Sequence, residues 1–290
     1  MPHATRSAAL ISAVVWLMLT TTPAAQRPPQ RIISLIPAVT EILFAIGAGP
    51  QVIAVSSFDE YPPDVKHLQR VGALLDPDLE RILSLRPDLV VAYGSQQDLL
   101  KQLSHAGIGA YNYRHAGLAD VNRTIREVGD RVGRGKSAEA VVSRIDAHMA
   151  SIRQRVSARE RPRTLLVFGR EIGALRGIYA NGGIGFLHDM LEAAGGEDVL
   201  GDIKRESVQA TTELILARKP EVILEIRPGS AAAASIDSEI GVWRTLGSVP
   251  AVRAGRVHFI VDPRMVVPGP RVAEAAELLA RALHPEVFGK

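Results

Sequence analysis

Residues 79–92 read L-E-R-I-L-S-L-R-P-D-L-V-V-A, and residues 212–225 read T-E-L-I-L-A-R-K-P-E-V-I-L-E, 133 positions further along the chain. Glutamate, isoleucine, leucine and proline occupy the same places in both stretches, with a basic residue before each proline and an acidic residue after it. Each copy is typical of a short helix stopped by proline and followed by a buried strand, which is one step of a parallel sheet. The repeat indicates two related α/β lobes, although α/β folds also reuse such a step without duplication.

Around the first copy, apolar strands alternate with helices. Residues 31–36 (R-I-I-S-L-I) have the β-branched content of a buried strand that Pro37 ends, and Thr40 is placed to cap a helix that stops at Gly47 and Gly49. We expect further strands at residues 52–55, 89–92 and 109–113, and helices at residues 79–85 and 99–105. This alternation predicts a parallel, right-handed α/β layer.

A long amphipathic segment follows. Between residues 137 and 160, apolar side chains recur every three or four positions, at Val141, Ile145, Met149, Ile152 and Val156. As a helix this segment would be about 36 Å long, enough to lie along two lobes and join them rigidly. Beyond it we expect a second α/β set of the same kind as the first, with strands at residues 164–168, 222–226 and 257–261 and helices at residues 186–194, 212–217 and 271–283.

The predicted fold class is therefore α/β, with two Rossmann-like lobes joined by one long rigid α-helix and a ligand cleft between the lobes. The N-terminal lobe is assigned to residues 31–133, the linking helix to residues 134–160 and the C-terminal lobe to residues 163–290.

The first 25 residues have the features of a secretory signal peptide. His3 and Arg6 precede an apolar run over residues 8–19, and small residues at 22–25 follow it. The run is shorter than the roughly 20 residues that span a bilayer, and the chain has no cysteine to carry a lipid anchor. We expect a soluble periplasmic protein whose mature N-terminus lies within a few residues of Gln26. Mass analysis of the purified protein checks this, and an intact Met1 would contradict it.

Composition and motifs narrow the function. The 290 residues are 47% hydrophobic and 22% charged, which is a globular mix, and the net charge of +3 includes no basic run of the kind that binds nucleic acid. Residues 181–186 (N-G-G-I-G-F) contain a Gly-x-Gly, but His188 occupies the third glycine position of a dinucleotide site. No G-x-S-x-G, H-E-x-x-H or P-loop occurs, so we expect no enzyme. Because the histidines are scattered singly, we also expect no metal site, which disfavours a zinc or manganese binding protein.

Several motifs, in order, resemble a known family. They are R-I-I-S-L-I-P-A-V-T-E-I-L-F-A-I-G-A-G at 31–49, V-S-S-F-D-E-Y-P-P at 55–63, L-E-R-I-L-S-L-R-P-D-L-V at 79–90, A-A-G-G-E-D-V at 193–199 and T-E-L-I-L-A-R-K-P-E-V-I at 212–223. The chain resembles the periplasmic substrate-binding proteins of ABC importers, in the class whose lobes are joined by one long helix and which carries cobalamin, iron–siderophores or haem. Y-P-P and G-G-E-D-V are most similar to the cobalamin-binding branch.

The resemblance implies a function. The chain would capture cobalamin or a related corrinoid and deliver it to an inner-membrane ABC permease, as a monomer with no cofactor of its own. A ferric siderophore or haem is the alternative ligand, and a non-transport receptor built on the same lobes stays open. Glu80 and Glu213 match the acids that meet arginines of the permease in this family. Each is otherwise a solvated acid near a helix start.

Candidate ligand contacts follow in part from the resemblance. Phe58, Leu74 and Tyr93 match cleft positions of the cobalamin binders, and Leu74 departs from the aromatic residue found there. Tyr61 joins Phe58 and Tyr93 because aromatic residues, only 4% of the chain, gather in this region.

In the second lobe, the candidate ligand contacts follow or flank predicted strands. They are Arg170, Arg176, Tyr179, Arg227, Trp243 and Arg264. Core packing of the aromatic residues and ordinary surface positions for the arginines are the alternatives.

Overall fold

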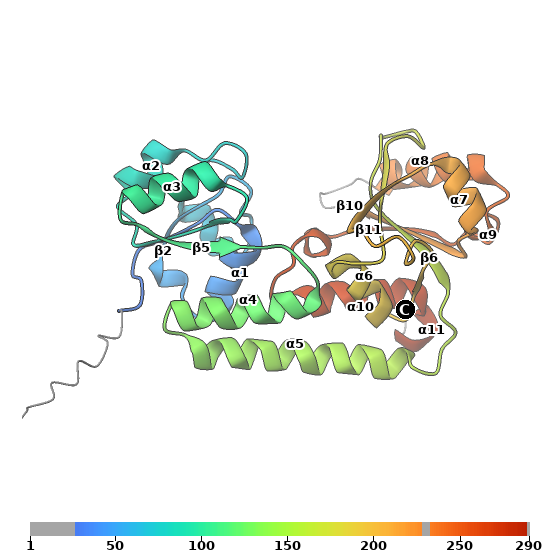
Figure 1. The fold of residues 1–290 in the computed structure, drawn as a ribbon. Helices are drawn as coiled ribbons and strands as arrows, with labels where there is room; N and C mark the ends of the chain where they lie inside the picture. The colour runs from blue at the N-terminus through green and yellow to red at the C-terminus, as the bar shows by residue number, and fades with distance from the viewer. Residues whose placement is uncertain (1–26, 228–232, 289–290) are drawn as a thin grey trace, which may run out of the picture.

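The computed structural model describes residues 27–227 and 233–288, and it contains two α/β lobes side by side above a pair of long helices (Figure 1). The predicted signal peptide, residues 1–25, lies outside the described residues. The two-lobed α/β prediction is confirmed.

The N-terminal lobe is built on a five-stranded parallel sheet in the order β3-β2-β1-β4-β5. Its strands are β1 (Ile32–Ser34), β2 (Val52–Val55), β3 (Gln69–Arg70), β4 (Leu89–Tyr93) and β5 (Gly109–Tyr113). Its helices are α1 (Pro37–Ala45), α2 (Leu79–Ser84), α3 (Gln97–His105) and α4 (Leu118–Arg131), with short 3-10 turns at Gly49–Gln51 and Pro63–His67. The strand order reverses at β1, and in such sheets ligands bind beyond the carboxyl ends of the strands at this point.

Helix α1 begins earlier than predicted. Pro37 is its first residue, where the missing N–H of proline costs nothing, and Thr40 lies buried inside the helix instead of capping it. The Thr40 hydroxyl donates to the carbonyl oxygen of Ile36 at 3.3 Å. The helix therefore starts directly at the carboxyl end of β1.

The C-terminal lobe has a mixed sheet in the order β11-β10-β6-β7-β9, with β8 also paired to β6. Its strands are β6 (Arg163–Gly169), β7 (Ile178–Asn181), β8 (Glu197–Asp198), β9 (Ser207–Ala210), β10 (Val222–Arg227) and β11 (Val257–Val261). Its helices are α6 (Phe186–Ala193), α7 (Thr212–Arg218), α8 (Ala233–Trp243), α9 (Pro250–Arg253), α10 (Val272–Leu283) and α11 (Pro285–Phe288), with 3-10 turns at Arg244–Leu246 and Pro263–Val266.

The sheet of the second lobe differs from that of the first in the direction of one strand. Strand β7 runs antiparallel to both β6 and β9. The loop between β6 and β7 turns back through Gly173 and Gly177, whose φ angles of 73° and 57° lie in the left-handed region that glycine adopts without strain. A parallel return would have needed a crossover of a dozen residues or more.

Helix α5 (Gly135–Val156) is the predicted linker, and it ends four residues before Glu160. It runs beneath both lobes, with α4 packed along it (Figure 1). Helix α4 is absent from the sequence-based prediction. None of the described helices is long and apolar enough to cross a membrane.

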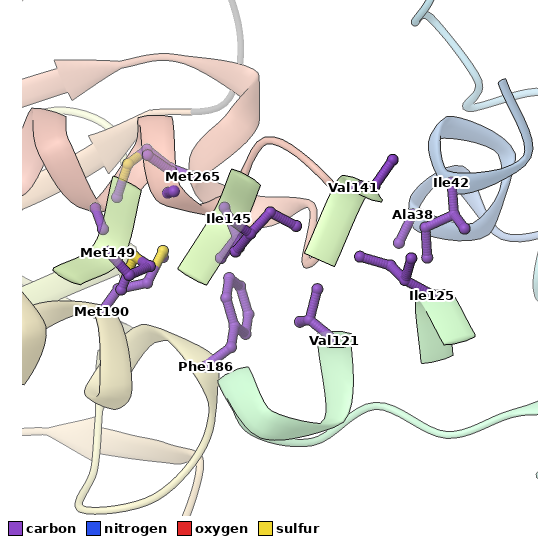
Figure 2. Close-up of a cluster of buried hydrophobic side chains, with 14 of the residues drawn as sticks. Ala38, Ile42, Val121, Ile125, Val141, Ile145, Met149, Phe186, Met190 and Met265 are labelled. Carbon is purple, nitrogen blue, oxygen red and sulfur yellow. The ribbon is translucent and has the colours of Figure 1, made fainter. Parts of the chain in front are cut away.

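A single hydrophobic cluster connects the lobes. Figure 2 shows Ile42 of α1 and Ile125 of α4 at one end of it, Ile145 of α5 near the middle, and Met190 of α6 with Met265 at the other end. Separating the lobes would expose this apolar surface to water, which is unfavourable. The cleft above the cluster is therefore built on a shared core.

Candidate ligand-binding cleft

A cavity of about 520 Å³ lies between the lobes. The first lobe contributes residues that follow β1 and β2, end β4 and β5, or follow β5, and the second lobe contributes the segment between β11 and α10. The lining residues are Ile36, Pro37, Ala38, Glu41, Phe58, Glu60, Tyr61, Tyr93, Tyr113, His115, Pro263, Val266, Val267, Pro268 and Arg271. The cavity thus occupies the position that the strand order of the first sheet favours.

Aromatic side chains form one wall of this cavity. The structure brings together Phe58, Tyr61 and Tyr93, the three aromatic residues that the sequence analysis selected in this lobe. Phe58 is 69% exposed and Tyr61 is 44% exposed, so neither serves mainly as core packing. The rings of Tyr93 and Tyr113 meet edge to face with centroids 5.4 Å apart. Burial raises the pKa of both phenols, which keeps them uncharged.

Tyr113 and His115 also line the cavity, although neither is among the sequence-based candidates. The sequence did contain a signal for both residues. Tyr113 ends the predicted strand at residues 109–113 and His115 follows it, so both are expected at the same strand end as Tyr93. Leu74, the family position that departs from an aromatic residue, is half-buried, and its carbonyl oxygen accepts a hydrogen bond from Gln96 at 2.7 Å. It does not line the cavity.

A smaller cavity of about 240 Å³ adjoins the first and shares His115 and Val266 with it. Its remaining wall comes mainly from the second lobe, including Phe168, Phe186 and Glu206. The His115 ring meets the Phe186 ring edge to face at 5.1 Å. Burial lowers the pKa of His115, which favours the neutral imidazole.

The charges in the cleft are few. Among the residues that line the two cavities, Arg271 is the only arginine or lysine, while Glu41, Glu60 and Glu206 are acidic. Arg271 is held by Glu41 in a two-point contact, with Nε 2.8 Å from Oε2 and Nη2 2.5 Å from Oε1. The described residues that line these two cavities therefore offer a ligand no unneutralised positive charge.

Two second-lobe candidates, Arg170 and Trp243, are buried away from both cavities. The Arg170 side chain is 0% exposed and contacts Glu225 at 3.0 Å and Glu239 at 2.7 Å. Trp243 is also 0% exposed, and its indole N–H donates to Oε2 of Glu225 at 2.8 Å. Glu225 lies on the buried strand β10, where a carboxylate without partners would be very unfavourable. Both side chains thus satisfy this buried acid.

The other four second-lobe candidates also lie away from the two cavities. Arg227 extends the same buried network through Glu225 and Glu239. Arg176 is exposed and pairs with Glu171, and Tyr179 is exposed on β7. Arg264 pairs with Asp262 and Glu274. The structure places none of these four in the cavity lining.

Glu80 and Glu213 occupy equivalent places in the two lobes. Glu80 lies in the first turn of α2, which Asp78 caps, and Glu213 lies in the first turn of α7, which Thr211 caps. Both are exposed, and neither has a basic partner among the described residues. Hydrogen bonds from its own backbone N–H and from the Thr211 hydroxyl lower the pKa of Glu213. Figure 1 shows α2 and α7 on separate lobes, on the side of the molecule away from α5.

Two α/β lobes that share a base of long helices and enclose an aromatic cleft define a two-lobed ligand-binding protein. A family model described as "Periplasmic binding protein" matches residues 32–263, and the chain belongs to this family. It is a substrate-binding protein of an ABC transporter and not an enzyme, as its motifs indicated.

Three relatives illustrate the match. The uncharacterised ABC transporter substrate-binding lipoprotein YvrC of Bacillus subtilis is 30% identical over 91% of this chain and 82% of its own length. A vitamin B12-binding protein of Yersinia pestis is 27% identical over 88% of this chain and 89% of its own. The apo structure of the periplasmic haem-binding protein RhuT of Roseiflexus superposes with a TM-score of 0.74 and 26% identity, covering 89% of this chain and 99% of RhuT.

Proposed function

We propose that this protein captures cobalamin or a related corrinoid in the interlobe cleft and delivers it to an inner-membrane ABC permease. The observation that carries this proposal is a cavity with an aromatic wall, in which Arg271 is the one arginine among the described lining residues and is already neutralised by Glu41. A corrinoid is a large ring edged by uncharged amides, which needs apolar area and hydrogen bonds more than charge. The vitamin B12-binding relative supports the same choice.

Haem or a ferric siderophore is the alternative ligand. Likeness to RhuT favours haem, as do the tyrosine and histidine side chains in the lining, since both residue types ligate haem iron. Haem carries two carboxylates and ferric siderophores are commonly anionic, so their recognition usually employs arginine or lysine. The acidic residues that line the two cavities argue against both.

A thermal-shift screen of the purified mature protein tests the ligand. Cyanocobalamin, cobinamide, haemin and several ferric siderophores are compared at matched concentration. A ligand present at 100 times its dissociation constant should stabilise the protein by about 2.7 kcal/mol. We expect the corrinoids to raise the melting temperature and the others to leave it unchanged. A shift with haemin or a siderophore alone would reassign the ligand and leave the transport role intact.

We further propose that Glu80 and Glu213 dock the permease. Two exposed carboxylates, one on each lobe, give a two-point electrostatic contact that affects encounter rate and orientation. Replacing both with lysine should reduce corrinoid uptake by cells about tenfold or more, because like charges would then face the arginines of the permease. Glu160→Lys is the control, since Glu160 is an exposed acid beyond the end of α5. Calorimetry should find unchanged cyanocobalamin affinity in all variants; an equal loss there would assign Glu80 and Glu213 to ligand binding.

The proposed place of work is the periplasm, after removal of residues 1–25. The YvrC relative is described as a lipoprotein, whereas this chain has no cysteine that a lipid would modify. We therefore propose a mature protein that diffuses between the outer membrane and the permease.

A further inference from the structure

An ion pair between the lobes forms part of the cleft wall. Glu41 lies on α1 of the first lobe, and Arg271 immediately precedes α10, 230 positions later. The Glu41 side chain is 4% exposed and that of Arg271 is 17% exposed. The guanidinium also stacks on the Tyr61 ring, 3.8 Å from its centroid. Two charge-assisted hydrogen bonds to Glu41 and one cation–π contact with Tyr61 therefore fix Arg271 against the first lobe.

Arg271 retains one free edge. Its Nε and Nη2 atoms face Glu41, while Nη1 has no hydrogen-bond partner among the described residues. Because Arg271 lines the cavity, it has a donor left for an acceptor on the ligand. Its positive charge, however, is balanced by Glu41 at hydrogen-bond distance, and Glu60 adds an acid to the same lining.

We infer that Glu41 determines the ligand specificity of the cleft, because it neutralises Arg271 and so favours uncharged acceptors such as amides over carboxylates. This inference rests on the proposed binding of a ligand in the cleft, and it names the side chain that selects the ligand's charge. Without Glu41, the Arg271 guanidinium would form a charge-assisted hydrogen bond with a carboxylate of the ligand. With Glu41 in place, a ligand carboxylate bound to Arg271 would lie close to the Glu41 carboxylate, and the two negative charges would repel each other.

Glu41→Gln is the direct test, because glutamine keeps the shape and one hydrogen bond to Arg271 but removes the charge. Burial raises the pKa of Glu41, with the hydrogen bond and charge of Arg271 opposing the rise, so the site tolerates an uncharged side chain and this variant should fold. Glu60→Gln is the matched control. It removes one negative charge from the same cavity without releasing an arginine.

The probes are cyanocobalamin and its monocarboxylic acids, in which one amide has been hydrolysed, with haemin as a third ligand. In Glu41→Gln, the affinity of the monoacids relative to cyanocobalamin should rise about tenfold, the size of one charge-assisted hydrogen bond. Glu60→Gln should raise this ratio less than about threefold, because no hydrogen bond or ion pair joins Glu60 to Arg271 among the described residues. The double variant Glu41→Gln/Arg271→Met should lose the gain. An unchanged ratio in Glu41→Gln, or an equal rise in Glu60→Gln, overturns the inference.

Two further outcomes separate this inference from the proposed function. If wild-type protein ignores cyanocobalamin but binds haemin, the corrinoid proposal fails, and a tighter haemin complex in Glu41→Gln still supports the role of Glu41. Should Glu41→Gln not fold, Arg271→Met tests the pair from the other side. It leaves the Glu41 charge uncompensated and should weaken monoacid binding more than cyanocobalamin binding. Binding of no probe by any variant overturns both proposals.

Discussion

Replacing Trp243 with alanine is expected to lower the free energy of unfolding by about 3 to 5 kcal/mol and to leave ligand affinity unchanged. Trp243 is fully buried in the core cluster of the second lobe, so truncation removes a large apolar side chain and leaves a cavity. It also removes the indole N–H that donates to the buried carboxylate of Glu225. Both losses act on the folded state and neither involves the described cleft lining.

Urea denaturation and calorimetry together check this prediction. Trp243→Phe is the graded control, since it keeps most of the apolar volume but loses the hydrogen bond to Glu225. It should lower the free energy of unfolding less than Trp243→Ala does. The opposite pattern, with native stability and weakened cyanocobalamin binding in Trp243→Ala, would restore Trp243 as a ligand contact.

Truncating Phe58 or Tyr93 to alanine should weaken cyanocobalamin binding about 30-fold each, or about 2 kcal/mol. Both rings line the main cavity, and each would lose the contact area that a flat macrocycle covers. Phe58 is largely exposed, so Phe58→Ala should leave the melting temperature nearly unchanged. Its effect on affinity would then reflect ligand contact alone.

Tyr179→Ala is the control for these two variants. Tyr179 is 46% exposed, close to the 44% of Tyr61, but it lies on β7 and lines neither cavity. Calorimetric titration should therefore find wild-type affinity in Tyr179→Ala. Full affinity in Phe58→Ala and Tyr93→Ala would remove the aromatic wall from the binding site, whatever ligand the protein carries.

The two lobes, the long helix between them and the aromatic residues of the cleft are all predictable from the order of the residues. The helix-to-strand repeat and the apolar stripe of α5 are local patterns, and local patterns follow directly from residue order. Phe58, Tyr61 and Tyr93 were found because the carboxyl ends of parallel strands meet at one edge of a sheet. Glu80 and Glu213 were expected near the starts of two short helices, and both are exposed in the first turns of those helices.

The contacts of the arginines and of Trp243 could not be predicted from the sequence, because they join residues far apart in the chain. An arginine after a strand has the same sequence signature whether it meets water, a ligand or a buried acid, and Arg170 meets Glu225, 55 positions away. The antiparallel course of β7 likewise depends on a turn and on pairing with β9, not on the composition of β7. Glu41 and Arg271 are 230 positions apart, and no periodicity relates them. Their pairing, and with it the charge of the cleft, exists only because the shared core brings α1 and the start of α10 together.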